Sequence, residues 1–244
     1  MKLTDALQKS GVSAIIYGES GIGKTHFIGT LPGKTLIIAA EANGIKTLEK
    51  FPEEIKKNLS VDFLPTPGKS IEATSAEYNK YFDSLIIQDM PYDNIVLDSA
   101  TELASMLLIQ RTDINKNGGS PTQKNYGDVI SCMKRYLRIL RDLAIIKGKN
   151  VLILALEAEI TLAQSADGQS ASKTHPGMIG KKFTPEAEGL FDIVAHMEKR
   201  SDGSRVFRLE GNEVFVAKDR FGRKGCVADG KVFLSGKTTT EEEK

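Results

Sequence analysis

Short apolar runs alternate with longer segments of helical periodicity along most of the chain. The apolar runs predict buried strands, and the periodic segments predict helices that cover them. This alternation is typical of an α/β fold with a mostly parallel sheet flanked by helices. The predicted strands are residues 12–17, 35–40, 61–64, 94–97 and 151–156, and the predicted helices start at Lys24 or span residues 77–87, 101–110 and 128–147.

The second half of the chain contains both the clearest and the weakest patterns. Residues 128–147 place apolar side chains at three- and four-residue spacing, which predicts an amphipathic helix. Residues 158–188 are rich in Gly, Ser, Thr and Lys and have little periodicity, so we expect a long loop, functional or disordered. Residues 192–198, 205–210 and 214–217 predict closing antiparallel strands. We expect one domain over residues 12–235, a short segment 1–11 before it and a disordered polar tail 236–244.

The composition is that of a globular, intracellular protein. The chain has 244 residues, of which 40% are hydrophobic, so it can bury a sizeable core and is not disordered throughout. Two cysteines cannot form a disulfide framework, which favours a reducing compartment. No signal peptide and no apolar run near the ~20 residues of a membrane span are found, so we expect a cytoplasmic protein without a membrane partner. The net charge of +1 identifies no partner.

A phosphate-binding sequence follows the first predicted strand. Residues 18–25, Gly-Glu-Ser-Gly-Ile-Gly-Lys-Thr, match the pattern G-x-x-x-x-G-K-[ST] between a strand and a helix start. In such a loop the backbone N–H groups surround a phosphate, the lysine reaches the β and γ phosphates, and the threonine hydroxyl ligates Mg²⁺. The residues expected to bind the nucleotide are Gly18, Glu19, Ser20, Gly21, Ile22, Gly23, Lys24, Thr25 and His26.

Two carboxylates follow predicted strands and complete this chemistry. Asp98 ends the apolar run 94–97, and a phosphate loop needs an acid on an adjacent strand to support the metal together with Thr25. Glu41 follows the run 35–40 and is suited to general-base activation of water. Either acid could instead cap the helix that follows it, and Glu41 could be a solvated loop residue. In a strand order of RecA type, Glu41 would lie beside the phosphate-loop strand.

These motifs, in this order, resemble those of RecA-fold ATPases. The resemblance implies a RecA-like P-loop NTPase core that binds ATP and Mg²⁺. Residues 218–222, Lys-Asp-Arg-Phe-Gly, resemble the Lys-Asn-Arg-Phe-Gly motif of RadA-type ATPases, with Asp219 in place of the Asn. In RecA relatives, basic residues at this place reach the ATP of the neighbouring subunit, so Lys218 and Arg220 become candidate catalytic residues beside Glu41 and Lys24. At the usual γ-phosphate sensor position stands Glu157, a poor hydrogen donor.

The chain most resembles the phage RecA-like proteins of the Sak single-strand annealing group, which are phage AAA-domain nucleotide-binding proteins. In RecA-like recombinases two polar loops bind single-stranded DNA, and by position these are residues 113–127 and 158–188. Nucleic acid binding there needs cations and stacking rings. The candidate DNA-binding residues are Lys124, Lys173, Lys181, Lys182 and Phe183, whereas His175 is expected to be an exposed loop histidine.

The resemblance implies an ATPase, slow and stimulated by single-stranded DNA, that anneals strands during phage DNA recombination. It would form a homo-oligomer, ring or filament, work with a single-strand-binding protein, and occupy the host cytoplasm if encoded by a phage. The alternative is a nucleotide-switch ATPase that positions or loads a protein partner without DNA-stimulated hydrolysis. A small-molecule kinase is disfavoured, because residues 158–188 contain no arginine for a lid over the acceptor.

Overall fold

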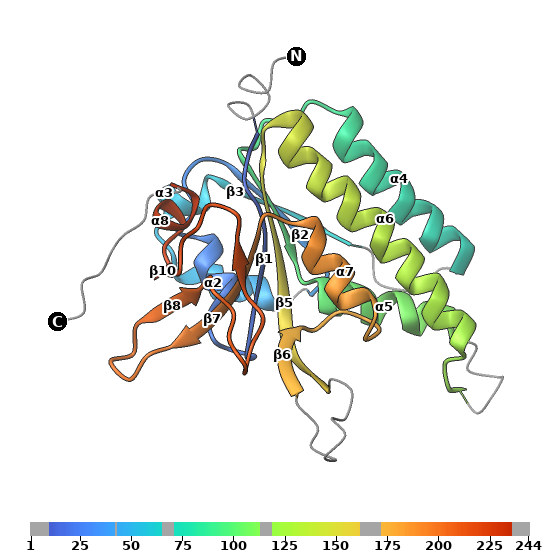
Figure 1. Ribbon diagram of the computed structural model, residues 1–244. Coiled ribbons are helices and arrows are strands. Elements are labelled where there is room, and N and C mark those ends of the chain that lie inside the picture. Colours follow the sequence, from blue (N-terminus) through green and yellow to red (C-terminus); the bar gives the residue numbers. More distant parts are fainter. Residues whose placement is uncertain (1–9, 42, 65–70, 113–118, 162–171, 236–244) are drawn as a thin grey trace, which may run out of the picture.

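The computed structural model describes residues 10–41, 43–64, 71–112, 119–161 and 172–235. Their strands form one sheet in the order β10-β8-β7-β1-β5-β4-β2-β3, with β6 paired to β5 and β9 paired to β7 (Figure 1). The strands are β1 (Ser13–Gly18), β2 (Thr35–Ala39), β3 (Leu59–Phe63), β4 (Asn94–Asp98), β5 (Asn150–Thr161), β6 (Ser172–Pro176), β7 (Ile193–Lys199), β8 (Arg205–Arg208), β9 (Lys218–Asp219) and β10 (Gly225–Val227).

The sheet is parallel in its centre and antiparallel at the end of the chain. β1 pairs in parallel with β5 and β7, and the pairs β5–β4, β4–β2 and β2–β3 are also parallel. β8 and β10 extend the sheet beyond β7 in antiparallel pairings. The predicted α/β class, with a mostly parallel sheet and antiparallel C-terminal strands, is therefore confirmed.

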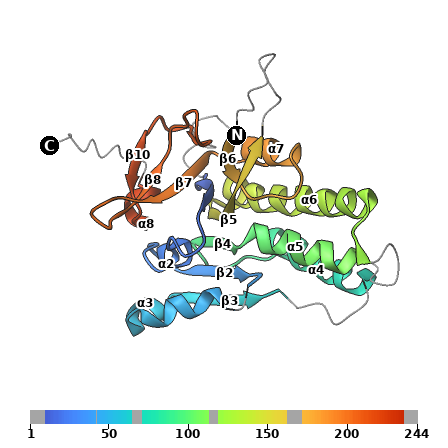
Figure 2. The same cartoon turned by 90° about the horizontal axis from the view of Figure 1, so that it is seen from below.

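Helices cover both faces of this sheet (Figures 1 and 2). Successive residues of β1 alternate between the faces, because side chains in a strand point in opposite directions. Ile15 packs into the core that includes residues of α4, α5, α6 and α7, whereas Ile16 packs into the core that includes residues of α2, η1 and α8. The helices are α2 (Lys24–Ile28), η1 (Gly44–Lys50), α3 (Glu53–Lys56), α4 (Ile71–Ile87), α5 (Ala100–Arg111), α6 (Gln123–Lys147), α7 (Phe183–Leu190) and α8 (Gly230–Leu234).

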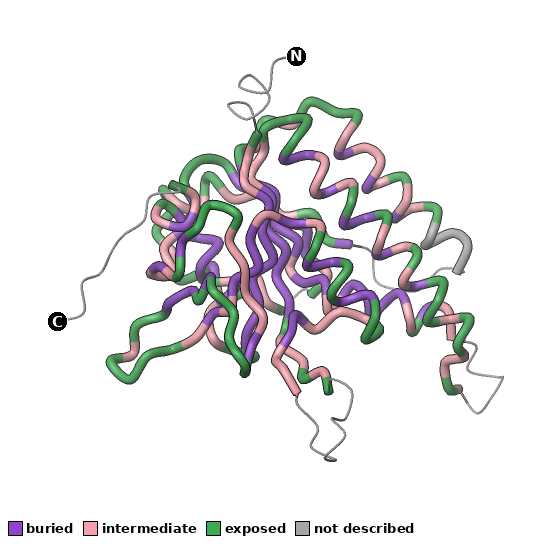
Figure 3. Tube along the Cα trace, viewed as in Figure 1, coloured by how far each residue is buried: buried purple, intermediate pink, exposed green. Residues whose placement is uncertain are grey.

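The central strands are the most deeply buried part of the molecule, as Figure 3 shows in purple. All six residues of β1 and the stretch 151–155 of β5 are buried. The amphipathic helix predicted over residues 128–147 is confirmed, although α6 starts earlier. Thr122 caps it, since the Thr122 hydroxyl accepts a hydrogen bond from the Asn125 N–H and the Asn125 side chain accepts one from the Thr122 N–H.

The expectation of an unstructured loop over residues 158–188 is wrong for the part that the structure describes. β5 continues to Thr161 and pairs with β6 in an antiparallel ribbon, and α7 follows. Figure 1 shows this ribbon projecting beyond the sheet. Its residues carry no hydrophobic period because, beyond Ala155, β5 is only partly buried or exposed. Residues 162–171 lie outside the described residues.

The closing strands are only partly as expected. β7 and β8 confirm two of them, but residues 214–217 form no strand and contribute one isolated bridge, between Phe215 and Thr174. Two short strands that the apolar pattern does not indicate, β9 and β10, pair with β7 and β8 instead. Residues 1–9 and 236–244 lie outside the described residues, so the short first segment and the polar tail stay predictions. Among the described helices, none is long and apolar enough to cross a membrane.

Candidate active site

The phosphate loop connects the buried strand β1 to helix α2. Gly21 and Gly23 have φ angles of 76° and 110°, in a region that residues with a Cβ adopt only under strain. Together with Ser20 and His26, these glycines line a pocket of about 250 Å³ at the carboxyl edge of the sheet. The spacing of glycines in the motif is therefore explained by the turn that the backbone makes here.

Lys24 is held inside this loop. Its Nζ donates hydrogen bonds to the carbonyl oxygens of Gly18 (2.8 Å) and Glu19 (2.7 Å). Burial lowers the pKa of the Lys24 ammonium below its ordinary value, and the Asp98 carboxylate partly opposes that shift. The ammonium thus lies among carbonyl groups at the position from which a lysine reaches phosphate oxygens.

Thr25 and Asp98 are in contact in the lining of the pocket. The Thr25 hydroxyl donates to Asp98 Oδ2 at 2.8 Å. Burial raises the pKa of the Asp98 carboxyl, and the nearby Glu41 carboxylate raises it further, while the hydrogen bond from Thr25 lowers it. A hydroxyl and a desolvated carboxylate are hard oxygen donors that fit Mg²⁺. Within the described residues, no group of three or more His, Cys, Asp or Glu side chains is placed to hold a metal ion.

The strand order differs from what the sequence reasoning assumed for both acids. β5 separates β1 from β4, so Asp98 is not on a strand adjacent to the phosphate loop, and β2 neighbours β4 rather than β1. The error arose because buried apolar runs do not specify their neighbours. Glu41 and Asp98 nevertheless line the same pocket as Lys24 and Thr25, since parallel strands end at one edge of the sheet.

The nine residues predicted to bind nucleotide lie in three places. Ser20, Gly21, Gly23, Lys24, Thr25 and His26 line the pocket. Glu19 and Ile22 instead line a second hollow of about 250 Å³, on the β7 side of the loop. Gly18 is buried at the end of β1, where its carbonyl accepts from Lys24.

Sequence reasoning missed several residues of the pocket wall, including Thr101 and Glu102 at the start of α5. The Thr101 hydroxyl accepts a hydrogen bond from the Leu156 N–H (3.0 Å) and donates one to the Gly177 carbonyl (2.8 Å). One side chain therefore connects the pocket to the base of the β5–β6 ribbon. The helix start was detectable, because Ser99 and Glu102 match the S-x-x-E pattern and the Ser99 hydroxyl accepts from the Glu102 N–H.

Glu157, at the expected sensor position, does not line the nucleotide pocket. Its carboxylate Oε2 lies 3.2 Å from Nε2 of His196, in the second hollow beside Glu19. The preceding residue, Leu156, faces the nucleotide pocket instead. Alternation along β5 thus directs the acid away from the pocket.

Lys218 and Arg220 lie at the far end of the sheet from the phosphate loop. β9 pairs with the start of β7, beside the start of β1, whereas the loop follows the end of β1. Arg220 Nη1 donates to Asp192 Oδ1 at 3.0 Å. Burial lowers the pKa of Lys218, and the neighbouring positive charge of Arg220 lowers it further. Neither side chain lines this chain's own pocket.

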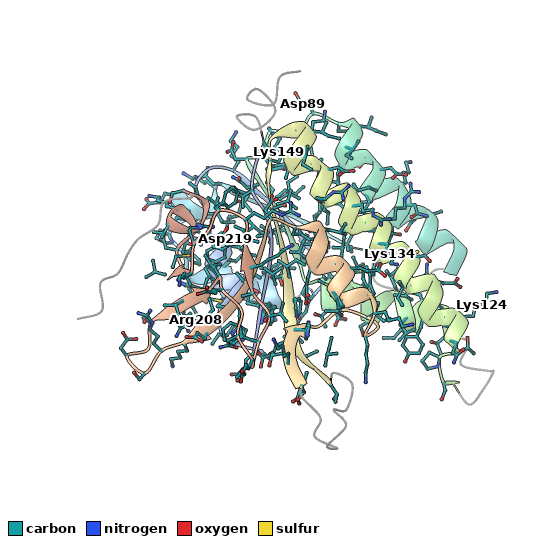
Figure 4. The ribbon with its side chains drawn as sticks, in the orientation of Figure 1. Asp89, Lys124, Lys134, Lys149, Arg208 and Asp219 are labelled. Carbon is teal, nitrogen blue, oxygen red and sulfur yellow. The ribbon has the colours of Figure 1, made fainter. Side chains whose placement is uncertain are left out.

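The candidate DNA-binding residues fall into two classes. Lys124, Lys181 and Lys182 are exposed, and Lys173 on β6 is half-buried; Figure 4 labels Lys124 at the lower end of α6. Phe183 is only 2% exposed and belongs to the core, so the expected stacking role is wrong for this structure. His175 is also buried rather than exposed, and its Nδ1 lies 2.8 Å from Glu188 Oε1. The sequence predicted both residues to be exposed, because the polar residues around them give no indication of the contacts that β6 and α7 make.

A comparison with models of protein families finds one family whose model spans these features. The model of the family described as "AAA domain" matches residues 10–221 of the 244-residue chain, a span that covers the phosphate loop, Glu41, Asp98 and the 218–221 segment. No curated protein sequence matches the chain. A family of this kind implies nucleotide binding, usually with Mg²⁺. The chain therefore belongs to the AAA domain family, and its phosphate loop is that of a P-loop ATPase.

Proposed function

We propose that this protein is an ATPase that binds single-stranded DNA and promotes strand annealing in phage DNA recombination. The observation that carries the proposal is the Thr101 side chain, which lines the nucleotide pocket and whose hydroxyl bonds Leu156 of β5 and Gly177, the residue directly after β6. The ribbon leads into one of the two loops that the RecA resemblance assigns to DNA. A change in the pocket on nucleotide binding would therefore reach the base of the ribbon through Thr101.

Exposed lysines in the two segments that the RecA resemblance assigns to DNA support this proposal. Lys181 and Lys182 are exposed just before α7, and Lys124 is exposed at the start of α6. Exposed lysines of this kind neutralise phosphates without reading sequence. Since Phe183 is buried, we expect binding to depend on charge and therefore to fall steeply with salt.

The pocket residues divide the work of hydrolysis. The loop N–H groups and the Lys24 ammonium would bind the phosphates and stabilise charge on the transferred group. Thr25 and Asp98 would hold Mg²⁺, which when bound neutralises the phosphate oxygens. Glu41 would orient the attacking water and accept its proton, while the bond from the γ phosphorus to the bridging oxygen breaks and ADP leaves.

Lys218 and Arg220 support an oligomeric enzyme. Because they lie at the opposite end of β1 from the loop, a head-to-tail neighbour could present them to a pocket that its own chain cannot complete. Repetition of such a contact closes into a ring or extends as a filament. Lys218→Ala or Arg220→Ala should then abolish hydrolysis without changing nucleotide binding by the monomer.

The ATPase rate with and without a single-stranded oligonucleotide tests the proposal. We expect the oligonucleotide to raise the rate of the wild type, and Lys182→Ala and Lys218→Ala to remove that stimulation. Lys147→Ala is the matched control, since Lys147 is exposed at the other end of α6. The buried Phe183 favours the second candidate, a switch that positions a protein partner, and a rate indifferent to DNA would select it.

A further inference from the structure

Arg205 contacts the phosphate loop from the opposite end of the sequence. It begins β8 directly after the turn that follows β7, and its Nε donates a hydrogen bond to the Ile22 carbonyl at 2.5 Å. The backbone of Arg205 is fixed on both sides: it pairs with Lys199 of β7, and its carbonyl accepts the Ala228 N–H at 2.9 Å. The side chain is therefore presented to the loop by the sheet itself.

The contact also involves Gly23. A Cβ built on Gly23 would lie 2.8 Å from Arg205 Nε and 3.1 Å from its Cδ. The arginine stem thus packs directly on the loop backbone, in space that any side chain at position 23 would need. The φ angle of 110° favours glycine at position 23, and a side chain there would also displace the end of Arg205 from the loop.

The geometry of the peptide unit connects this contact to the nucleotide. In a trans peptide the C=O and the following N–H point in opposite directions. The Ile22 carbonyl is directed at Arg205, so the N–H of Gly23 is directed to the other side of the loop, and Gly23 lines the nucleotide pocket. A cationic donor on the carbonyl holds this peptide plane and strengthens its N–H as a donor.

We infer that Arg205 is a positioning residue for the nucleotide phosphates, which acts by holding the Ile22–Gly23 peptide in the orientation that binds them. The inference rests on the proposed nucleotide binding and adds to it a role for the β7–β8 hairpin. Pre-organisation of this kind raises affinity because the loop does not have to be ordered when the ligand binds. Loss of Arg205 should therefore weaken binding of the phosphates and leave the contribution of the base to affinity unchanged.

Titration of fluorescent ADP tests the inference, with pyrophosphate as a competing probe that lacks base and ribose. Arg205→Met keeps the stem but removes the donors, and we expect it to weaken the binding of ADP and of pyrophosphate about tenfold each, near the lower limit for loss of a charged hydrogen bond. Arg205→Lys should restore part of the affinity. Arg208→Ala is the matched control on the same strand, since Arg208 pairs with Glu198 and should bind within about twofold of wild type.

Each outcome decides the matter. The positioning role is overturned if Arg205→Met binds ADP with wild-type affinity. It is also overturned if this variant binds ADP more weakly but pyrophosphate with unchanged affinity. If Arg205→Met lowers the unfolding midpoint measured without nucleotide, Arg205→Lys becomes the deciding variant. The NMR shift of the Gly23 amide reports whether that variant still contacts the Ile22 carbonyl. Nucleotide binding like that of the wild type without this contact overturns the inference. Failure of wild type to bind, or undiminished binding by Lys24→Ala, would instead reject the proposed function.

Discussion

Buried charged groups lie near both ends of β1. Burial disfavours the charges at the carboxyl end, whereas those at the amino end form a direct ion pair. At the carboxyl end, burial shifts the pKa of Lys24 downward and that of Asp98 upward, so both charges are disfavoured where they lie. At the amino end, Asp219 Oδ2 accepts from Arg223 Nε at 2.6 Å, and both side chains are almost completely buried. Figure 4 labels Asp219 in this second region.

The difference indicates which region binds a ligand and which supports the fold. Charges that burial disfavours gain most when a ligand of opposite charge arrives, and such groups cluster at functional sites. Asp219 and Arg223 compensate each other's charge, and the Phe233 carbonyl accepts from Arg223 Nη1, although among the described residues Arg223 Nη2 has no hydrogen-bond partner. Removal of either partner would leave a buried charge uncompensated. Arg220 lies between these cases, since its own side chain is exposed and the Asp192 side chain that it contacts is half-buried, so the arginine can exchange this ion pair for another partner.

The largest effect is expected from breaking the buried pair. Asp219→Ala leaves the Arg223 guanidinium charged and buried, which should lower the free energy of unfolding by about 3–5 kcal/mol. Urea unfolding measures this change. Glu210→Ala is the control, because the Glu210–Lys224 pair is exposed and its loss should cost less than about 1 kcal/mol. Equal losses for the two variants would contradict the comparison.

The next largest effect belongs to the other end of β1. Lys24→Ala removes the buried ammonium from the phosphate loop, and we expect the ATPase rate to fall by about 10²–10³, the usual cost of one donor in a pre-organised anion site. The free energy of unfolding without nucleotide should change little, since among the described residues the ammonium donates hydrogen bonds to two loop carbonyls. An unchanged rate would reject the phosphate-loop assignment.

A smaller effect separates the metal from the phosphates. In the wild type, Mg²⁺ should tighten ATP binding, because Thr25 and Asp98 supply oxygen ligands beside the phosphates. In Asp98→Asn we expect this Mg²⁺-dependent gain to fall by about tenfold, while ATP binding in a chelator stays near that of wild type. Calorimetric titration with and without Mg²⁺ measures both. The same gain in both proteins would remove Asp98 from the metal site.

The smallest effect is expected for Arg220 in the isolated monomer. Arg220→Ala breaks an ion pair between an exposed arginine and a half-buried aspartate, so the free energy of unfolding should change by less than about 1 kcal/mol and nucleotide affinity by less than twofold. Comparison of ADP titrations at low protein concentration checks this. A strong loss of monomer binding would contradict a role toward a neighbouring subunit.

Those parts of the fold and site that depend on contiguous residues could be predicted from the sequence. The phosphate loop occupies eight successive positions, and the apolar runs at β1, β2, β4 and β5 each lie within one strand. By contrast, the Arg205–Ile22 and Thr101–Leu156 hydrogen bonds join residues 183 and 55 positions apart. No local pattern signals such pairs, since polar residues in a turn or a helix start have many other uses.

The sequence alone therefore determined the class of fold and the chemistry of the phosphate loop, because both follow from short-range periodicity and from the conformations open to glycine. Only the tertiary structure decided that β5 lies between β1 and β4, and that Glu157 faces His196 while Leu156 faces the pocket. Only it decided that Phe183 is buried. The physical reason is that strand order and burial result from packing among distant segments. Apolar runs of similar composition do not specify which strand each one pairs with.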